Sequence, residues 1–325
     1  MMDKVDIVFA SDKVRCRAWL YRPQLSKREG GPCIVMAHGL GGTREAGLEP
    51  YAIKFAEAGY RVLVFDYRHF GDSDGEPRQL FSIRRQLEDW QNAIAYVRGL
   101  EDVDPRRIAL WGTSFSGGHV IVAAARDGHI AAVSAQCPMM DAMSGALNVI
   151  HYAGFAAFLK LGVYGMLDQL RAMLGLSPLY IPLIAPPGEL AAMSSHDSLS
   201  GYGAIVPAYW RNQICPRYAL TIAGYRPISH ANKVSCPVLI QVCTNDSLAP
   251  PGSAIATAKK MGDRARLTLY ECGHFDIYVG ELFKRASEEQ LAFFNERLLP
   301  AEANQHAVHN VSASRTPMNC HRSCG

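Results

Sequence analysis

The chain has 325 residues, of which 49% are hydrophobic, and this composition excludes disorder over most of its length. Its 33 basic and 30 acidic residues give a formal net charge of +3 without a dense basic run, which argues against a nucleic-acid-binding protein. The length fits one α/β enzyme core that carries an insertion.

The first part of the chain alternates short apolar strands with helices. Residues 4–22 predict two strands that meet at a polar turn. Further apolar runs predict buried strands at 33–38, 61–66, 107–112 and 131–136. Apolar residues at helical spacing predict helices at 44–58, at 81–100 and from residue 117 onward. Strands that alternate with helices form a mostly parallel sheet with helices on both faces.

This alternation stops near residue 143. The residues that follow are apolar and interrupted by Gly and Pro, without a rhythm of strands and helices. The pattern then resumes with a strand over 236–246, a helix near 253–261, a strand over 265–274 and a helix near 284–297. We therefore expect an α/β core formed by residues 1–142 and 230–299. Residues 143–229 are expected to form an inserted helical cap or lid, and residues 300–325 a flexible tail.

Ser114 lies where the predicted strand 107–112 leads into a helix. A serine on such a sharp turn exposes its hydroxyl at the carboxyl edge of the sheet, and the helix N-terminus favours negative charge there. The turn is crowded, so the residues two positions before and after the nucleophile must be small. Here they are Gly112 and Ser116. The serine at the second small position makes Ser116 an alternative nucleophile.

The later part of the chain contains a candidate acid and a candidate base. His274 follows the last predicted strand and is the expected general base for Ser114. Asp246 lies 28 residues earlier, at the carboxyl end of a buried strand, and is expected to orient the imidazole and stabilise its charged form. Asp141, which follows the strand 131–136, is an alternative acid.

Glycines follow the strand 33–38 in the sequence HGLGG. They allow the backbone to approach a substrate closely. The backbone N–H groups of Leu40 and Phe115 are therefore the candidates for an oxyanion hole.

Five segments carry a resemblance to a known family. They are HGLGG, FDYRHFGDSDGEPR, WGTSFSGG, CTNDSLAPP and CGHFD, in this order. Residues 1–299 resemble the α/β-hydrolase superfamily and, within it, the dienelactone-hydrolase-like and S15-peptidase-like branch. In that branch the chain is similar to carboxylesterases and to fungal polyketide transferases. The resemblance implies the α/β-hydrolase fold, an acyl-serine mechanism with a Ser114–His274–Asp246 triad, and no cofactor.

The insertion and the acidic turn at 66–78 bear on what the chain binds. Tyr152, Phe155 and Phe158 predict an apolar acyl pocket under the cap, and ordinary packing of cap helices on the core is the alternative. The acidic turn lacks the ligand spacing of a calcium loop, so we expect no metal.

The sequence is interpreted as that of a serine hydrolase, similar to carboxylesterases and thioesterases, that acts on an ester or thioester of an apolar acyl compound. An acyltransferase with the same triad and a non-catalytic binding protein on the same fold are the alternatives. The expected partner is a small-molecule acyl substrate, with no nucleic acid, and a homodimer is compatible with the sequence.

The N-terminus, the lengths of the apolar runs and the cysteines bear on the cellular location of the protein. The N-terminus is charged at once and lacks the apolar region of a secretory signal. No run reaches the about 18 apolar residues of a membrane span. The nine cysteines show no CxxC spacing and are expected to be free thiols in a reducing environment. These features favour a cytoplasmic protein.

Overall fold

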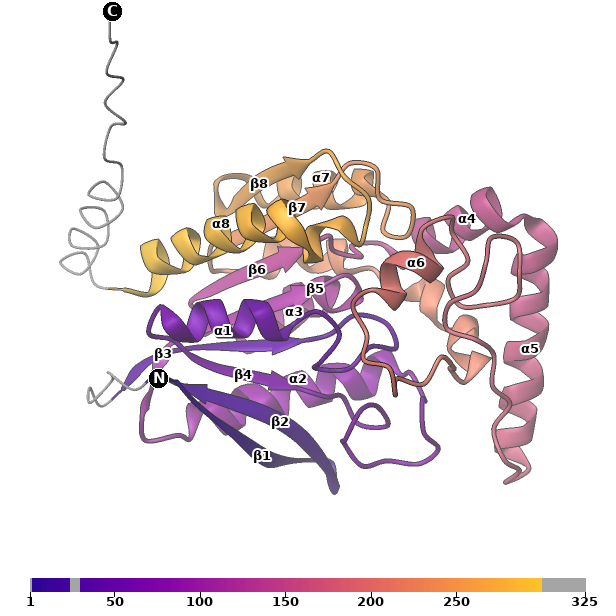
Figure 1. Ribbon diagram of the computed structural model, residues 1–325, viewed down its shortest axis with the longest axis horizontal. Helices are drawn as coiled ribbons and strands as arrows, with labels where there is room; N and C mark the ends of the chain where they lie inside the picture. Colours follow the sequence, from indigo (N-terminus) through magenta and orange to yellow (C-terminus); the bar gives the residue numbers. More distant parts are fainter. Residues whose placement is uncertain (1, 24–29, 300–325) are drawn as a thin grey trace, which may run out of the picture.

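The computed structural model describes residues 2–23 and 30–299, and one eight-stranded sheet runs through them (Figure 1). The strand order is β1-β2-β4-β3-β5-β6-β7-β8. β1 pairs antiparallel with β2 and β2 antiparallel with β4, while the remaining neighbours pair in parallel. The strands are β1 (Asp3–Ser11), β2 (Val14–Arg22), β3 (Gly31–Ala37), β4 (Arg61–Phe65), β5 (Val103–Thr113), β6 (Ala132–Gln136), β7 (Val238–Cys243) and β8 (Ala265–Tyr270). The predicted mostly parallel α/β sheet is confirmed.

The central strands β3, β4, β6 and β7 are buried at every position because both of their faces are covered. Along β3, Val35 and Ala37 join one hydrophobic core while Ile34 and Met36 join the other. Successive side chains of a strand point to opposite faces, so a strand between two helical layers needs apolar residues at both. The sheet therefore divides the protein into two cores.

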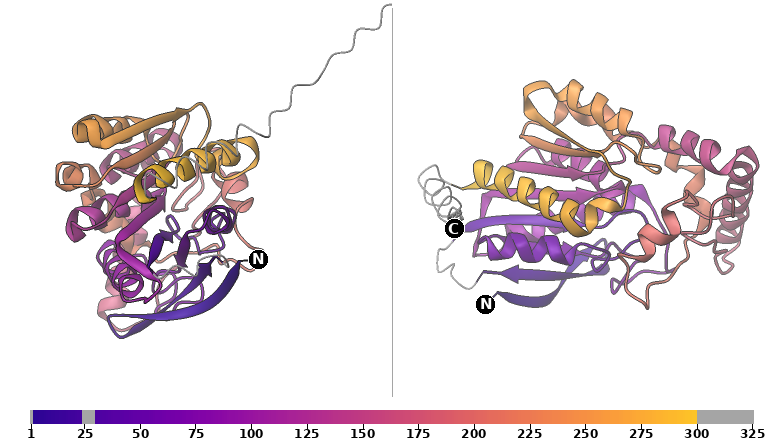
Figure 2. Two further views of the ribbon diagram at one scale, coloured as in Figure 1. Left: turned by 90° about the vertical axis from the view of Figure 1, so that its left-hand side faces the viewer. Right: turned by 45° about the horizontal axis from the view of Figure 1, so that its top comes forward.

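Helices cover both faces of the sheet, as the two views in Figure 2 show. On one face Phe55 of α1 packs edge-on against Phe294 of α8, with ring centroids 5.5 Å apart. On the other face Trp90 of α2 packs edge-on against Phe65 of β4 at 5.2 Å. The helices around the sheet are α1 (Glu49–Glu57), α2 (Ile83–Arg98), α3 (Phe115–Asp127), α7 (Pro251–Met261) and α8 (Gly280–Leu298).

Helix α1 begins later than predicted, at Glu49 rather than at residue 44. The preceding residues are held in a loop, because the backbone N–H of Arg44 donates to Asp66 Oδ1 at 2.7 Å. Gly47 takes a φ of 70°, a left-handed conformation that ends any helical path there. The helix can start only after this loop, with Pro50 in its first turn.

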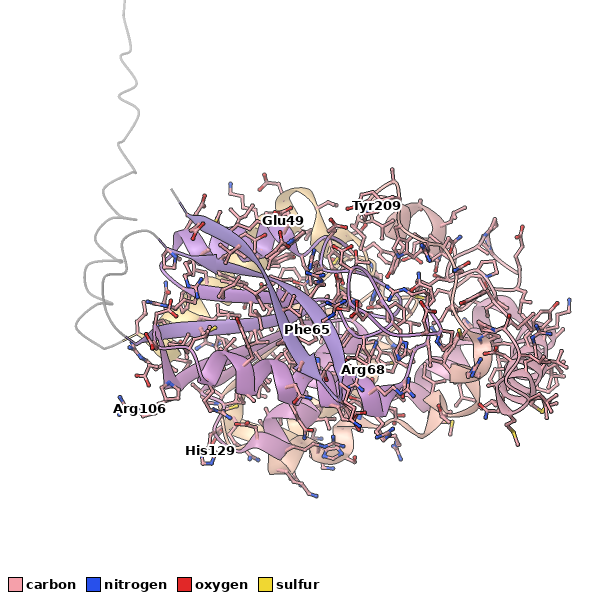
Figure 3. The ribbon with its side chains drawn as sticks, turned by 90° about the horizontal axis from the view of Figure 1, so that it is seen from below. Glu49, Phe65, Arg68, Arg106, His129 and Tyr209 are labelled. Carbon is pink, nitrogen blue, oxygen red and sulfur yellow. The ribbon has the colours of Figure 1, made fainter. Side chains whose placement is uncertain are left out.

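The turn that follows β4 ties several elements together. Asp66 also accepts from the backbone N–H of Asp72 at 3.2 Å. Arg68, labelled in Figure 3, donates to Asp89 of α2 at 2.6 Å and to Ser11 of β1 at 2.7 Å. This buried network fixes residues 66–78. Asp66 of this segment then holds the loop after β3 through its hydrogen bond with the backbone of Arg44.

The residues between β6 and β7 form a separate group of helices at one end of the sheet (Figure 1). Asp141 caps the first of them through its side chain, and Gly154, with a φ of 85°, separates the first from the second. The helices of this segment are α4 (Ala142–Ala153), α5 (Phe155–Met173), α6 (Ser198–Gly203) and the short 3-10 helices η1 (Pro216–Leu220), η2 (Ile222–Gly224) and η3 (Pro227–Lys233).

A buried ion pair holds α5 in place. Asp168 is fully buried and accepts from Arg217 Nε at 2.6 Å and Nη2 at 2.9 Å. The backbone N–H of Leu179 also donates to Asp168, at 2.8 Å. A buried carboxylate needs such partners, so the pair fastens α5 to η1.

None of the helices within 2–23 and 30–299 is both long enough and apolar enough to cross a membrane. The seven cysteines in these ranges are all buried free thiols. The predicted tail at 300–325 lies outside the described residues.

Candidate active site

Ser114 lies on the turn between β5 and α3, with a φ of 55° and a ψ of −121°. A non-glycine residue in this region is strained by on the order of 1–3 kcal/mol. Backbone hydrogen bonds hold the conformation: the Ser114 N–H donates to Gln136 O at 2.9 Å, and Ser114 O accepts from Gly117 and Met139. The turn therefore projects the hydroxyl above the carboxyl edge of the sheet.

The surroundings of this turn leave no space for larger residues. A Cβ on Gly112 would collide with the backbone carbonyl of Ser116. A Cβ on Gly39 would lie 2.9 Å from Ser114 Cβ. The loop after β3 thus passes directly beside the serine, as expected from the glycines there.

Ser116 has a different environment from Ser114. It is fully buried, and its Oγ lies 2.7 Å from the hydroxyl of Tyr67, which itself accepts from Trp90 Nε1 at 2.7 Å. Ser116 therefore belongs to a hydrogen-bond network inside the core. The geometry favours Ser114 over Ser116 as the nucleophile.

Ser114, His274 and Asp246 form one chain of hydrogen bonds. His274 Nε2 lies 3.0 Å from Ser114 Oγ, and His274 Nδ1 lies 2.6 Å from Asp246 Oδ2. The other carboxylate oxygen of Asp246 accepts from the backbone N–H groups of Leu248 and Ala249, at 2.8 and 2.7 Å. The loop after β7 thus fixes the carboxylate, which fixes the imidazole.

The electrostatics of this pair favour a charged imidazole. Burial of His274 opposes its protonation, but the Asp246 carboxylate favours protonation more strongly, and the pKa of His274 is raised above its ordinary value. A raised pKa strengthens a base that must take a proton from a serine hydroxyl.

Asp141, the alternative acid, is engaged elsewhere. Its Oδ1 accepts from the backbone N–H of Met143 at 3.0 Å, and its Oδ2 accepts from Arg226 Nε at 2.9 Å. It caps α4 and pairs with an arginine, while Asp246 occupies the hydrogen-bonding position on His274.

The loop after β3 is oriented by His38. Nδ1 of His38 lies 2.9 Å from the carbonyl oxygen of Gly39, and since a carbonyl only accepts, this nitrogen carries the proton. Burial lowers the pKa of His38 to about 4, so its imidazole stays neutral. The Gly39 carbonyl and the Leu40 N–H belong to one peptide unit, so His38 orients that N–H.

Residues of the helical segment also contact this loop. Tyr202 of α6 donates to Leu40 O at 2.8 Å, and Trp210 Nε1 donates to Gly41 O at 3.0 Å. Next to Asp246 in the sequence, the Ser247 hydroxyl donates to Asp197 Oδ1 at 2.6 Å. Sequence reasoning missed these contacts because the partners lie far apart in the chain and form no motif.

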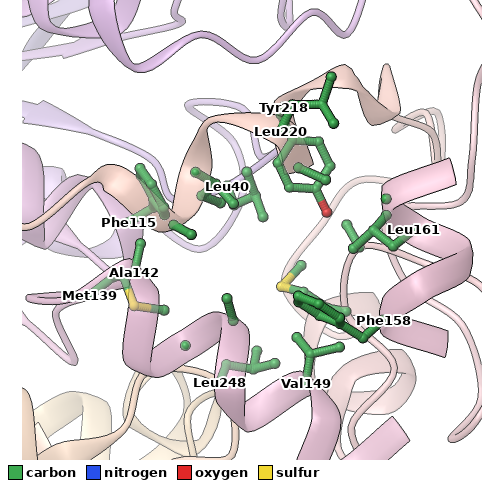
Figure 4. Close-up of a pocket in the computed structure, with 18 of the residues that line it drawn as sticks. Leu40, Phe115, Met139, Ala142, Val149, Phe158, Leu161, Tyr218, Leu220 and Leu248 are labelled. Carbon is green, nitrogen blue, oxygen red and sulfur yellow. The ribbon is translucent and has the colours of Figure 1, made fainter. Parts of the chain in front are cut away.

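An apolar pocket with a volume of about 320 Å³ opens beside Ser114. Figure 4 shows Leu40 and Phe115 on one side of it and Phe158 and Leu161 on the other. Among its described lining residues none is charged, and the further ones come mainly from α4, α5, η1 and η2, including Ala146, Val149, Tyr152, Leu159, Val163, Met166, Tyr218, Leu220 and Ile222. Ser114 is thus one of the residues that line an apolar cavity.

Of the three aromatic residues expected at the substrate pocket, Phe155 lies outside it. Tyr152 and Phe158 line the cavity, whereas Phe155 is 59% exposed and stacks on Phe158 with ring centroids 6.5 Å apart. The physical reason is the break at Gly154: α5 begins at Phe155, and this first position faces solvent. The placement of Phe155 in the pocket was therefore wrong.

One group in the described part of the chain has the residue types of a metal site. Ligand atoms of Cys137, Asp246 and His274 lie within 4.8 Å of one another. Asp246 Oδ2 and His274 Nδ1 are 2.6 Å apart. Two ligand atoms at about 2.1 Å from a tetrahedral zinc ion would lie roughly 3.4 Å from each other. The spacing fits a proton between the two groups.

Comparisons with known proteins show which family this chain resembles. The model of the X-Pro dipeptidyl-peptidase (S15) family matches residues 12–170. The quorum-quenching protein AidA of Acinetobacter baumannii is 43% identical over 302 residues, which cover 92% of this chain and 96% of that protein. The polyketide transferase ATR5 of Stachybotrys chlorohalonatus is 28% identical over 311 residues, which cover 92% and 99%.

A solved structure shares the whole fold. The α/β-hydrolase GrgF from Penicillium aligns with a TM-score of 0.74 at 23% identity, over 92% of this chain and 99% of that one. The strand order, the extent of the match to AidA and the S15 match all agree with the resemblance found in the sequence. The chain therefore belongs to the α/β-hydrolase family of serine hydrolases, together with its relative AidA, and just under half of it resembles the S15 peptidases.

Proposed function

We propose that the chain cleaves an ester or thioester of an apolar acyl compound through an acyl-serine intermediate. The observation that carries the proposal is the hydrogen-bonded chain Ser114–His274–Asp246, whose serine lines an uncharged apolar pocket. The segment at 143–229 is proposed to act as the cap that supplies most of this pocket.

The first half of the reaction forms the acyl-enzyme. His274 Nε2 takes the proton of Ser114 as Oγ attacks the acyl carbon, and Asp246 stabilises the resulting imidazolium. The N–H groups of Leu40 and Phe115 are proposed to bind the oxyanion, and each such donor lowers the barrier by roughly 3 kcal/mol. His274 then gives its proton to the leaving alcohol or thiol, and the acyl group stays on Ser114.

The second half releases the acid. Water donates a proton to His274 Nε2 as its oxygen attacks the acyl-serine carbon. The C–O bond to Ser114 breaks, and the proton returns to Ser114 Oγ. No step requires a cofactor.

The pocket supports an apolar acyl group of moderate size. An apolar cavity of about 150 Å³ is large enough for benzene, so a volume of about 320 Å³ accommodates an acyl group of on the order of a dozen carbon atoms. A dipeptidyl-peptidase would have to bind a charged amino terminus. The absence of charged side chains among the described lining residues favours an acyl ester over a peptide.

The nucleophile is tested by labelling with a fluorophosphonate probe. The native protein and Ser116→Ala should be labelled, while Ser114→Ala should not. Labelling that persists in Ser114→Ala, or is lost only in Ser116→Ala, would contradict the assignment. A series of p-nitrophenyl esters then tests the acyl pocket: the highest kcat/KM is expected between about six and twelve carbons, and a maximum at acetate would count against it.

Acyl transfer to an alcohol or amine is the second candidate, favoured by the 28% identity to a polyketide transferase over nearly the whole chain. The two reactions share the acyl-serine and differ only in the acceptor. Mass spectrometry of products formed with added alcohols separates them, since a transferase yields mainly the new ester and a hydrolase mainly the free acid.

A further inference from the structure

The solvent side of α5 is apolar along its whole length. We define the α5 outer face as Leu159, Val163, Met166, Leu170 and Met173, whose exposed fractions range from 46 to 73%. Phe155, Leu167 and Leu174 extend it and are also exposed. In Figure 1, α5 forms the outermost edge of the protein on the right-hand side of the view.

The inner side of the same helix is apolar as well, except for one buried carboxylate. Its buried residues are Leu161, Gly165 and Asp168, and Asp168 is paired with Arg217. A helix at the edge of a monomer normally buries its apolar side and turns its polar side to water. Helix α5 is apolar on its outer side as well as on its inner side, which indicates that a further partner covers the outer side.

The spacing on this face is that of a helix that pairs with another helix. Leu159, Met166 and Met173 follow one another at intervals of seven residues, and Val163 and Leu170 lie between them at the same interval. This is the a and d pattern of a coiled coil, in which each side chain inserts between residues of a facing helix. Charged side chains near the face are few, with Lys160 beside it.

We propose that the α5 outer face binds the same face of a second copy of this chain, forming a two-fold symmetric dimer. A two-fold interface must be self-complementary, and an uncharged stripe of apolar side chains at heptad spacing meets this condition. A membrane surface would be matched by a row of Lys and Arg residues flanking the apolar stripe. Among the described residues of α5 only Lys160 and Arg171 are basic.

The area of the face is sufficient for a stable pair. At about 100 Å² each, half of what a large side chain covers, the five residues of the α5 outer face and the three that extend it present on the order of 800 Å². The largest apolar patch on a typical monomer is about 300–600 Å², and a standard interface buries about 800 Å² per partner. The patch is therefore larger than a monomer is expected to expose.

The dimer has a consequence for the pocket, which rests on the proposed function. Leu159, Val163 and Met166 belong both to the α5 outer face and to the lining of the acyl pocket. A second copy would cover this thin wall and keep water from the bound acyl chain. The existence of the dimer does not depend on this consequence, so the two are tested separately.

Sedimentation velocity of the full chain from about 1 to about 100 μM tests the proposal. The native protein should sediment as a dimer, and Leu170→Glu should sediment as a monomer, with a dissociation constant raised at least about a hundredfold. Leu170 is 54% exposed and does not line the pocket, so the variant should keep its fold, as circular dichroism would verify. Ile255→Glu on α7 is the matched control, since Ile255 is also an exposed apolar helix residue, and it should remain a dimer.

Three outcomes would overturn the proposal. They are a native protein that stays monomeric at about 100 μM, a Leu170→Glu variant that stays dimeric, and a monomer that binds phosphatidylcholine vesicles through Leu170. The fluorophosphonate assay is run on the same samples. A monomeric Leu170→Glu variant that is still labelled supports the dimer and the serine mechanism independently of each other.

Discussion

The hydroxyl group of Tyr202 donates a hydrogen bond of 2.8 Å to the carbonyl oxygen of Leu40. Tyr202 comes from the segment between β6 and β7, whereas Leu40 lies on the loop after β3. The contact therefore links the helical segment to the backbone that is proposed to bind the oxyanion. The conformation of this loop thus depends on a residue that lies 162 positions further along the chain.

Tyr202→Phe should lower kcat about tenfold and change KM little. The substitution removes one hydrogen bond and keeps the ring, so the loop can turn the Leu40 N–H away from the oxyanion, which exists only in the transition state. Steady-state kinetics with a p-nitrophenyl ester measures both constants.

Tyr180→Phe is the control for this variant. Tyr180 also donates from the same segment to a backbone carbonyl, that of Arg78 at 3.1 Å, but this bond does not involve the loop after β3. Both substitutions should cost about 1 kcal/mol of folding free energy, and only Tyr202→Phe should reduce kcat. Equal losses of kcat would mean that the effect is one of general stability.

His38→Phe should reduce kcat about ten- to a hundredfold, because the Gly39–Leu40 peptide unit loses the donor that orients it. His38→Asn keeps an N–H donor close to the position of Nδ1 and should recover part of the activity. Since burial keeps the pKa of His38 at about 4, the loss should be the same from pH 6 to pH 9. A loss that varies with pH over this range would instead assign His38 a proton-transfer role.

The sequence predicted the parts of the site that are local in the chain. Ser114 and His274 each lie at the end of a strand, and this placement is visible as an apolar run followed by a turn. The choice between Ser114 and Ser116 was open, because it depends on Tyr67, a residue of another strand end that fills the hydrogen-bonding position of Ser116.

The sequence could not predict which side of α5 is buried. Both sides are apolar, so periodicity does not distinguish them, and the placement of Phe155 in the pocket failed for this reason. The decisive contacts are the Asp168–Arg217 pair and the break at Gly154. The pair joins residues far apart in sequence, and the backbone angle at a glycine has no signature in composition.

Asp246→Asn should lower kcat/KM by about three to four orders of magnitude and shift its pH dependence. Only neutral His274 can act as the base, and Asp246 raises its pKa, so native activity should rise with pH through a pKa above 6.5. Without the carboxylate this rise should move to lower pH. A pH profile of kcat/KM for both proteins checks the direction, and an unchanged profile would exclude Asp246 as the acid.

The same raised pKa affects stability. The charged His274 pairs with Asp246 in the folded protein, so its contribution is fully present below about pH 6.5 and is lost as the pH rises through the folded-state pKa. In urea unfolding, Asp246→Asn should therefore differ from the native protein more at pH 6 than above the folded-state pKa.

Ala146→Phe should shorten the preferred acyl chain by about four carbons or more. Ala146 lines the pocket on α4, and a phenyl group there would fill part of the about 320 Å³. Leu147→Phe, at the adjacent and 58% exposed position, is the control and should keep the native preference. The ester series measures both, and a shift in the control alone would place the acyl chain outside this pocket.

Asp168→Asn should destabilise the protein by about 3–5 kcal/mol, because Arg217 loses its charge partner in a buried setting. Hydrogen exchange should accelerate most in α5 and η1, the two helices that the pair joins. Glu296→Gln, in the exposed pair with Arg266, should cost less than about 1 kcal/mol. Uniform acceleration of exchange across the sheet would show that the pair does not act locally.

The chain leaves the sheet after β6 and returns to it at β7, and these two strands are direct neighbours. The loops that carry Ser114 and His274 thus need no rearrangement when the intervening segment changes in length or composition. Residues of the segment that line the pocket can change without disturbing the sheet, as long as Tyr202 and Trp210 keep their hydrogen bonds to the loop after β3. One scaffold can in this way diversify its substrates without rebuilding its reaction.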